Sequence, residues 1–232
     1  MAEARRALVA DWVAERDRHR EVRMLAARHS DVEALNALAR HELMARGQLG
    51  SAVAEACGRG FALGDQVVCL RNDRRRGVLN GTRGIVVAGS LSGGLNLLAG
   101  GRLVHLSAEY LEAGHLAHGY ATTVHKSQGE TLDRAFVLGS EALYREAGYV
   151  ALSRARVRTD LYIPTGSFED GVDDLGPRPF DLTRSLATSR AKHLALETQV
   201  EEDPVVDRIR RLLAQSEDRD LTVNVRETGP RR

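Results

Sequence analysis

Two short stretches of this sequence concentrate the side chains that bind phosphate groups. The first is Gly119–Gly129, GYATTVHKSQG, in which Thr123, His125 and Lys126 lie close together. Lysine occurs only twice in the whole chain, so its presence in this stretch is informative. Gly129 frees the backbone to approach a ligand closely or to open a helix. A lysine, a histidine and hydroxyl groups at a strand-to-helix corner form a phosphate-binding constellation.

The second stretch is Tyr149–Arg156, YVALSRAR, which follows about twenty residues later. Arg154 and Arg156 lie two positions apart, so on a helix they point to different sides. One can then face a nucleotide, where an arginine stabilises charge during phosphoryl transfer, while the other makes an ion pair. The alternative, which this stretch alone favours, is a helix C-terminus where arginines interact with the helix dipole.

Three further residues are candidates because of what surrounds them. Arg28 follows the apolar run Val22–Ala27 and can reach a phosphate, or it is a solvated strand end. Gln128 and Glu130 can bind a ribose or connect a nucleotide site to a nucleic-acid site. The alternative for this whole region is an ordinary strand–turn–helix with exposed polar residues, and composition alone makes the two interpretations equal.

A basic segment lies at Arg71–Gly84, RNDRRRGVLNGTRG. One interpretation is a basic hairpin whose Arg74 and Arg75 touch a nucleic-acid backbone. The other is a solvated β-hairpin with a type I′ turn at Asn80-Gly81, and the two carry equal weight because charge runs are usually solvated. The eight histidines are scattered, and their spacing predicts no metal site.

Composition limits the class of protein. The chain has 232 residues, 43% of them hydrophobic, so it can hold one large domain or two small ones with a real core. The net charge of +1 argues against a wholly basic surface but permits a local basic groove. Cys57 and Cys69 form no CxxC pair, which favours a reducing cytoplasm. No apolar run approaches the roughly 20 residues that span a membrane, so we expect no membrane partner.

The hydrophobic pattern changes its period twice along the chain. Helices are predicted over 3–19 and 31–46, with Ser30 as the N-cap of the second. Short strands separated by turn residues predict a small all-β barrel over about 61–112. From about Gly119 the pattern alternates again, with strands at 120–124, 135–138 and 161–163, a helix opening near Ser127 and another within 141–156. Alternating strands and helices imply a largely parallel sheet.

The sequence after Pro164 is less regular. Gly, Asp and Pro dominate 165–181, and surface helices are predicted over 187–199 and 205–215. The last fifteen residues are rich in charged residues and glycine, which predicts a frayed tail.

Together these pieces resemble the C-terminal half of superfamily 1 helicases of the RecD-like branch, which is a UvrD-like helicase C-terminal domain. The similarity is greatest to conjugative relaxase–helicases of the TraA or MobF type, and it covers about residues 1–164. Four stretches carry it in order: RMLAARHSDVEALN is similar to the fourth helicase motif, LRNDRRRGVLNGTRG to an inserted SH3-like module, GYATTVHKSQGET to the fifth motif and GYVALSRAR to the sixth.

The resemblance implies an α/β fold, with a RecA-like parallel sheet, helices on both faces and an inserted small SH3-like β-barrel. It divides the chain into a first RecA-like part at 1–60, the inserted module at 61–112, a second RecA-like part at 113–164 and a partly helical extension at 165–232.

The resemblance also implies roles for the candidate residues. Arg28 and Arg154 would reach the γ-phosphate of ATP, and Gln128, Gly129, Glu130 and Arg156 would lie beside the nucleotide. Single-stranded DNA would contact Thr123, His125, Lys126, Arg74 and Arg75. The family branch moves 5′ to 3′ along DNA.

One departure from the family limits these expectations. Helicases of this kind hold phosphates and Mg²⁺ with a P-loop, GxxxxGK[ST], and neither lysine of this sequence follows a glycine. The sequence begins almost where a second motor domain would begin. We therefore expect ATP and Mg²⁺ to bind only together with a P-loop-bearing first RecA-like domain, from the same gene or a separate chain, and the chain alone to lack ATP hydrolysis.

A second interpretation belongs to a different class of protein. The chain could instead be a non-catalytic module that binds single-stranded DNA, or an adaptor left over from such a helicase. In either case single-stranded DNA is the expected partner, and a relaxase is a further candidate.

Overall fold

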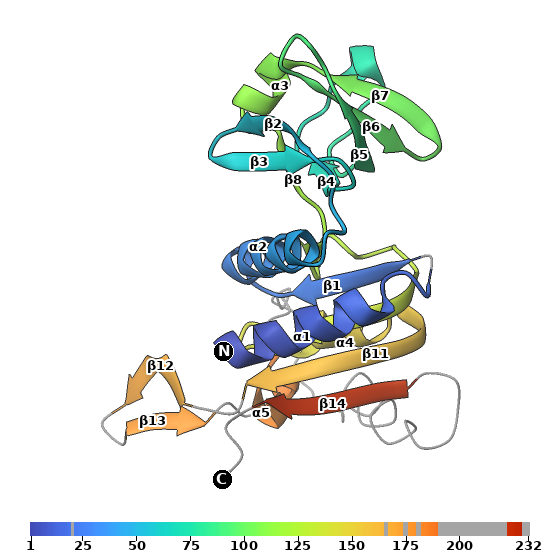
Figure 1. The fold of residues 1–232 in the computed structure, drawn as a ribbon. Helices are drawn as coiled ribbons and strands as arrows, with labels where there is room; N and C mark the ends of the chain where they lie inside the picture. The colour runs from blue at the N-terminus through green and yellow to red at the C-terminus, as the bar shows by residue number, and fades with distance from the viewer. Residues whose placement is uncertain (20, 165–166, 174–175, 180–181, 190–221, 229–232) are drawn as a thin grey trace. The chain divides into compact units, whose positions relative to one another are not determined.

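The computed structural model describes residues 1–19, 21–164, 167–173, 176–179, 182–189 and 222–228. They divide into two compact units, which we call the parallel-sheet unit (Met1–Leu38 with Ala121–Arg232) and the β unit (Ala39–Tyr120). The β unit interrupts the chain of the parallel-sheet unit (Figure 1). The helices predicted over 187–199 and 205–215 lie largely outside the described residues. Within the described ranges, no helix is both long and apolar enough to cross a membrane.

A five-stranded parallel sheet forms the centre of the first unit, in the order β14-β11-β10-β1-β9. Its strands are β1 (Val22–Ala26), β9 (Ala121–Thr123), β10 (Leu132–Leu138), β11 (Ala155–Pro164) and β14 (Thr222–Thr228). Every neighbouring pair is parallel, which confirms the predicted sheet type. The predicted frayed tail is wrong for β14, because this strand pairs with β11 along its whole length and so forms an edge of the sheet.

Helices cover both faces of this sheet, as predicted. α1 (Ala2–Glu15) packs against one face, over β1, β10 and β11. On the other face, Ala135 and Val137 of β10 share a core with α4 (Arg145–Leu152) and α5 (Leu182–Ala187). α4 and α5 approach closely at Gly148, where a Cβ would lie 2.2 Å from Leu186 Cδ2, so a larger residue there would require the Leu186 side chain to move.

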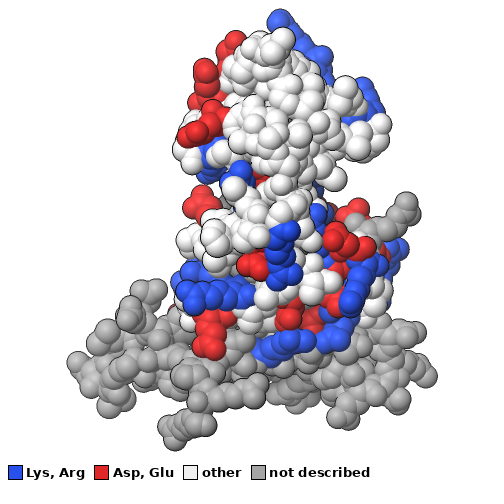
Figure 2. All heavy atoms as spheres, viewed as in Figure 1, with Lys and Arg blue, Asp and Glu red and all other residues white. Residues whose placement is uncertain are grey.

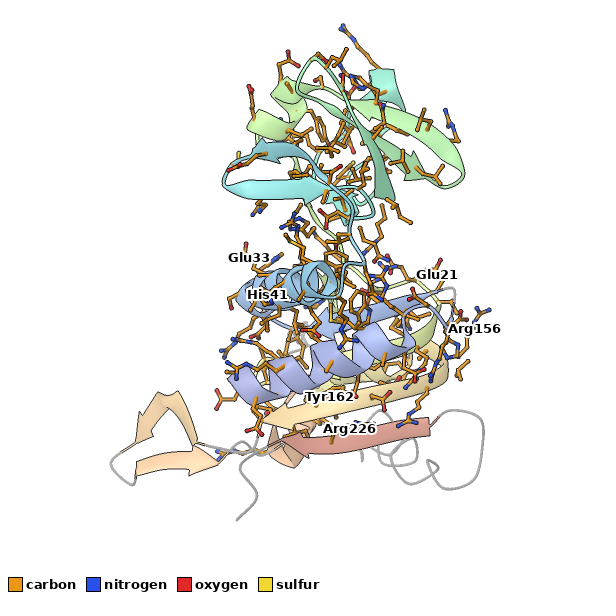
Figure 3. The ribbon with its side chains drawn as sticks, in the orientation of Figure 1. Glu21, Glu33, His41, Arg156, Tyr162 and Arg226 are labelled. Carbon is orange, nitrogen blue, oxygen red and sulfur yellow. The ribbon has the colours of Figure 1, made fainter. Side chains whose placement is uncertain are left out.

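The face under α1 is held by buried charges as well as apolar contacts. Arg134 of β10 pairs with Asp160 of β11 at 2.5 Å and with Glu15 of α1 at 2.6 Å. Tyr162, labelled in Figure 3, donates its hydroxyl to Asp11 at 2.6 Å. Burial, and then the neighbouring Asp11, raise the pKa of Tyr162 above its usual value. These ion pairs and the tyrosine hydrogen bond link α1 to the sheet.

α2 (His29–Ala45) follows β1 directly. Ser30 lies inside its first turn, so the prediction that Ser30 is the N-cap is wrong. The backbone carbonyl of Arg28 already accepts the Val32 N–H at 3.1 Å, so the helix starts within two residues of the end of the strand.

The β unit contains a five-stranded antiparallel sheet in the order β7-β6-β5-β4-β8 and a separate β2–β3 hairpin. Its elements are β2 (Ala52–Ala56), β3 (Arg59–Ala62), β4 (Gln66–Cys69), the 3-10 helix η1 (Arg74–Arg76), β5 (Arg83–Gly89), β6 (Leu95–Ala99), β7 (Arg102–Leu106), α3 (Ala108–Glu112) and β8 (Leu116–His118). The inner sheet face, with Val67, Val86 and Leu97, forms the core of the unit. Strand pairing among the described residues leaves this sheet open, so it does not show the predicted barrel.

The basic segment of the β unit is not the predicted type I′ hairpin. A turn runs from Leu79 to Thr82, whose N–H donates to the Leu79 carbonyl at 2.9 Å. Gly81 has a φ of +92°, whereas Asn80 is not among the described residues with positive φ. A type I′ turn needs positive φ at both central residues, so this is the pattern of a type II turn, in which glycine takes the second central position.

Candidate functional site

The stretch after β9 forms a compact turn in place of the predicted helix at Ser127. Residues 124–129 make successive turns, closed by bonds such as Gln128 N–H to His125 carbonyl at 3.2 Å. The Ser127 hydroxyl donates to the Val124 carbonyl at 2.7 Å, and Gly129 has a φ of +87°. A hydroxyl that occupies a backbone carbonyl, followed by a left-handed residue, prevents a helix from propagating.

This turn sorts its side chains into buried and exposed ones. Thr123 and Ser127 are buried, whereas His125, Lys126 and Gln128 are exposed. The Thr123 hydroxyl accepts the Lys126 N–H at 3.2 Å, so it shapes the turn from inside. Contact of Thr123 with DNA stays a prediction. In the structure, the Thr123 hydroxyl stabilises the turn that exposes Lys126.

His125 and Lys126 share an edge of the sheet with Arg28. β1 and β9 are parallel neighbours, with Ala26 opposite Thr123, so both chains leave the sheet at its carboxyl edge. Arg28 is exposed there and has no hydrogen bond or ion pair to a described side chain. The His125 ring is held by Tyr144, whose hydroxyl lies 3.1 Å from Nε2. We call Arg28, His125, Lys126 and Tyr144 the carboxyl-edge group.

Arg154 lies at the opposite edge of the sheet, after the end of α4 and before β11. Its Nε donates to the Val150 carbonyl of the last helical turn at 3.0 Å, which agrees with the helix-terminus interpretation. Its Nη1 also donates to the Glu130 carbonyl at 3.4 Å, and its Nη2 to the Ser153 hydroxyl at 3.1 Å. The structure therefore joins the two motif stretches directly, through one guanidinium.

Glu130 has a second arginine neighbour that the sequence did not reveal. Arg23 of β1 has a side chain only 11% exposed and lies 3.6 Å from the Glu130 carboxylate and 3.5 Å from that of Glu21. Burial lowers the pKa of Arg23, and the two carboxylates partly oppose that effect. Arg23 occupies the second position of a short strand, where nothing in the sequence pattern distinguishes a site residue from a solvated one.

Arg156 belongs to β11, so the prediction that it shares a helix with Arg154 is wrong. Its side chain is 63% exposed and pairs with Asp133 of β10 at 2.5 Å. The other oxygen of Asp133 accepts the Glu21 N–H at 3.1 Å. Figure 3 shows Glu21 and Arg156 at the same end of the parallel strands. We call Arg23, Glu130, Arg154 and Arg156 the amino-edge group.

The structure does not bring together the two arginines expected at one γ-phosphate. Arg28 follows the carboxyl end of β1, whereas Arg154 precedes the amino end of β11. The two residues therefore lie beyond opposite ends of the parallel strands. Contact of both arginines with one γ-phosphate stays a prediction.

Arg74 and Arg75 belong to the β unit, where both are exposed in η1. Arg76 pairs with Asp73 at 2.5 Å, but Arg74 and Arg75 make no ion pair within the described residues. Figure 2 shows arginine side chains along one border of this unit, beside a broad uncharged surface. This arrangement leaves two guanidinium groups available for an anionic partner.

The donors at the amino edge fit a nucleotide phosphate better than a metal ion. Guanidinium groups bind phosphate oxygens, whereas Mg²⁺ needs carboxylate, hydroxyl or water oxygens. Across the part of the chain that the structure describes, no group of three or more His, Cys, Asp or Glu could hold a metal.

Comparison with protein families supports the motif assignment. Residues 118–159 match the UvrD-like helicase C-terminal domain. The matched segment holds the turn after β9, all of β10, the first half of β11, and Arg154. Residues 118–159 are therefore similar to the C-terminal domain of UvrD-like helicases.

Curated relatives point to the same group. The conjugal transfer protein TraA of Rhizobium radiobacter is 40% identical over 171 residues, which cover 72% of this chain and 16% of TraA. The TraA of Agrobacterium fabrum is 40% identical over 172 residues, with the same coverage. The ATP-dependent DNA helicase Pif1 of Bdellovibrio bacteriovorus is 36% identical over 114 residues, covering 44% of this chain and 26% of Pif1. The chain thus matches about one sixth of the length of the TraA relatives.

Among solved structures, Pif1 helicase from Bacteroides in complex with ADP-AlF3 and ssDNA aligns with a TM-score of 0.44 at 22% identity. The alignment covers 59% of this chain and 38% of that one.

Proposed function

We propose that this chain is the second motor domain of an ATP-dependent DNA helicase of the conjugative relaxase–helicase type, moving 5′ to 3′ in the cytoplasm. The bond from the Arg154 guanidinium to the Glu130 carbonyl carries the proposal, because it links the two motif stretches at one place. The 40% identity to TraA proteins and the helicase domain match support it.

In this proposal the amino-edge group faces the nucleotide. Arg154 swings from its carbonyl partners to the γ-phosphate when ATP arrives, and Gln128, Gly129 and Glu130 lie beside the sugar and phosphates. Arg156 remains at the rim, paired with Asp133. An arginine delivered to a transferring phosphoryl group stabilises the charge of the transition state.

The carboxyl-edge group faces single-stranded DNA in the same proposal. His125 and Lys126 are exposed and adjacent, and Arg28, which the resemblance assigns to the γ-phosphate of ATP, follows the carboxyl end of the neighbouring strand β1. Thr123 supports the turn, and Arg74 and Arg75 supply further phosphate contacts from the β unit. Arginine and lysine contacts to phosphates make such binding salt-dependent.

The motor is completed by a P-loop-bearing domain, which supplies the phosphate cradle and the Mg²⁺ ligands that this sequence lacks. A relaxase is a second proposed partner, since two conjugal transfer proteins are 40% identical to this chain over 171 and 172 residues.

The direct experiment measures ATP hydrolysis by the purified chain, alone and mixed with a P-loop domain of the same family, with and without single-stranded DNA. We expect no turnover by the chain alone and DNA-stimulated turnover in the mixture, abolished by Arg154→Ala. Robust turnover by the chain alone that depends on Arg154 would contradict the proposal, because it requires a phosphate site within this chain.

A non-catalytic role in binding single-stranded DNA, or as an adaptor, is the second candidate. It is favoured by the carboxyl-edge group, whose exposed His125 and Lys126 are available whether or not a nucleotide is present. If the mixture with a P-loop domain never hydrolyses ATP but the chain binds DNA, the adaptor role replaces the motor role.

A further inference from the structure

The aromatic pair His125–Tyr144 is a contact between segments that the sequence does not connect. The Tyr144 hydroxyl lies 3.1 Å from His125 Nε2, and the ring centroids are 6.3 Å apart with an interplanar angle of 45°. Tyr144 is the residue before α4, nineteen positions after His125. Neither composition nor spacing pointed to it as a site residue.

Tyr144 is anchored, whereas His125 is exposed. The tyrosine is partly buried and packs against the core under α4, and its carbonyl accepts the Gly148 N–H at 2.7 Å as the helix begins. The packed ring therefore holds the Tyr144 hydroxyl at a fixed position near the surface. A side chain whose rotamer is held by packing can orient a neighbour at little further entropic cost.

The hydrogen bond leaves one histidine nitrogen available. His125 uses Nε2 with Tyr144, while Nδ1 has no partner among the residues that the structure describes. When the tyrosine donates to Nε2, the neutral ring carries its proton on Nδ1 and can donate it outward. Lys126 is the next residue, exposed and without a described partner. The two donors together suit a phosphodiester oxygen.

We infer that Tyr144 is a positioning residue for nucleic-acid binding. It fixes the tautomer and the orientation of the His125 ring, so that His125 and Lys126 bind one backbone phosphate together. This rests on the proposed binding of single-stranded DNA. Tyr144 itself contributes no charge, and in this inference it acts on the phosphate through His125.

The test is a double-mutant cycle on the purified chain, with a fluorescein-labelled oligothymidylate and anisotropy at several salt concentrations. Tyr144→Phe keeps the ring and removes the hydroxyl, and it should raise Kd by about threefold to tenfold, as expected for one lost hydrogen bond. His125→Ala should raise Kd by a similar factor, and the double variant no further. The salt slope should stay unchanged for Tyr144→Phe but fall by about 0.7 for Lys126→Ala.

Tyr162→Phe is the matched control, because it also removes one tyrosine hydroxyl, bonded to Asp11 at 2.6 Å under α1. It should lower the unfolding midpoint and leave Kd unchanged. Additive losses for Tyr144→Phe and His125→Ala, or an unchanged Kd for Tyr144→Phe while Lys126→Ala weakens binding, would overturn this inference alone. No binding by the unmodified chain would overturn the DNA proposal as well.

Discussion

Cationic side chains lie at both edges of the parallel sheet. They are bonded to protein groups at the amino edge, but exposed and without a described partner at the carboxyl edge. At the amino edge, Arg154 and Arg156 are bonded to protein groups, and Arg23 is nearly buried beside Glu130. At the carboxyl edge, Arg28 and Lys126 are exposed and have no described partner. Paired groups are pre-positioned but must exchange partners to bind a ligand, whereas unpaired groups bind anions without an exchange.

This difference suits two ligands with different demands. A nucleotide that is bound and released in each cycle benefits from arginines that return to a defined resting position. A DNA strand that slides benefits from donors that bind any phosphate without rearranging the protein. The following predictions test whether the two edges are independent.

The largest expected effect is on ATP turnover. In a complex with a P-loop domain, Arg154→Ala should lower the turnover rate about a thousandfold, as for other arginines that stabilise phosphoryl transfer. Binding of single-stranded DNA should stay within about twofold, since Arg154 lies at the other edge. Steady-state ATPase assays and anisotropy measure the two quantities, with exposed Arg6→Ala of α1 as the control. An equal loss of DNA affinity would show that the edges are coupled.

A smaller effect is expected on stability when the pair of Arg23 and Glu130 is broken. Arg23→Ala should lower the free energy of unfolding by about 2 kcal/mol, because it removes the mostly buried guanidinium that lies 3.6 Å from the Glu130 carboxylate. Denaturant unfolding measures this loss. The double variant Arg23→Ala with Glu130→Gln should recover part of it, and a full loss in both variants would mean that the pair contributes packing alone.

At the carboxyl edge, Lys126→Ala should weaken binding of single-stranded DNA by about threefold to tenfold at moderate salt without changing stability. The Lys126 ammonium is exposed and unpaired among the described residues, so its removal costs the folded chain nothing measurable. Anisotropy measures the DNA affinity, and thermal unfolding of the same samples measures the stability. A drop in the unfolding midpoint would show that Lys126 has a structural partner.

The smallest effect is expected for the exposed pair at the amino edge. Arg156→Ala removes an ion pair with Asp133 in which the arginine is 63% exposed, so the free energy of unfolding should fall by less than about 1 kcal/mol. Urea unfolding at low and high salt measures this loss. The difference in free energy of unfolding between Arg156→Ala and the unmodified chain should shrink as salt screens the pair. A loss as large as that of Arg23→Ala would remove the distinction between rim and buried arginines.

Local patterns in the sequence predicted much of the fold. Continuous apolar runs located β1, β10 and β11, and their alternation with helices indicated a parallel sheet with both faces covered. The predictions that failed depend on short-range chemistry that competes with such patterns. The Ser127 hydroxyl and the positive φ of Gly129 prevented the expected helix, and a single positive φ at Gly81 changed the turn type.

The prediction of a frayed tail at β14 failed for a different reason. Thr222–Thr228 carries little apolar signal of its own, and it becomes a strand by pairing with β11. An edge strand obtains its hydrogen bonds from a neighbour that is distant in sequence, so tertiary contact decides whether it forms.

What the sequence determined by itself is the order and chemistry of the two helicase stretches, since the residue types and their spacing are local properties. What only the tertiary structure decided is where those residues meet. β9 and β10 lie on either side of β1, so the chain between them must cross back from the carboxyl to the amino edge of the sheet. That crossing separates Lys126 from Glu130. As a result the Tyr144 hydroxyl contacts the His125 ring, and the Arg154 guanidinium donates to the Glu130 carbonyl. Strand order follows from long-range pairing and burial of the whole sheet, which no local spacing contains.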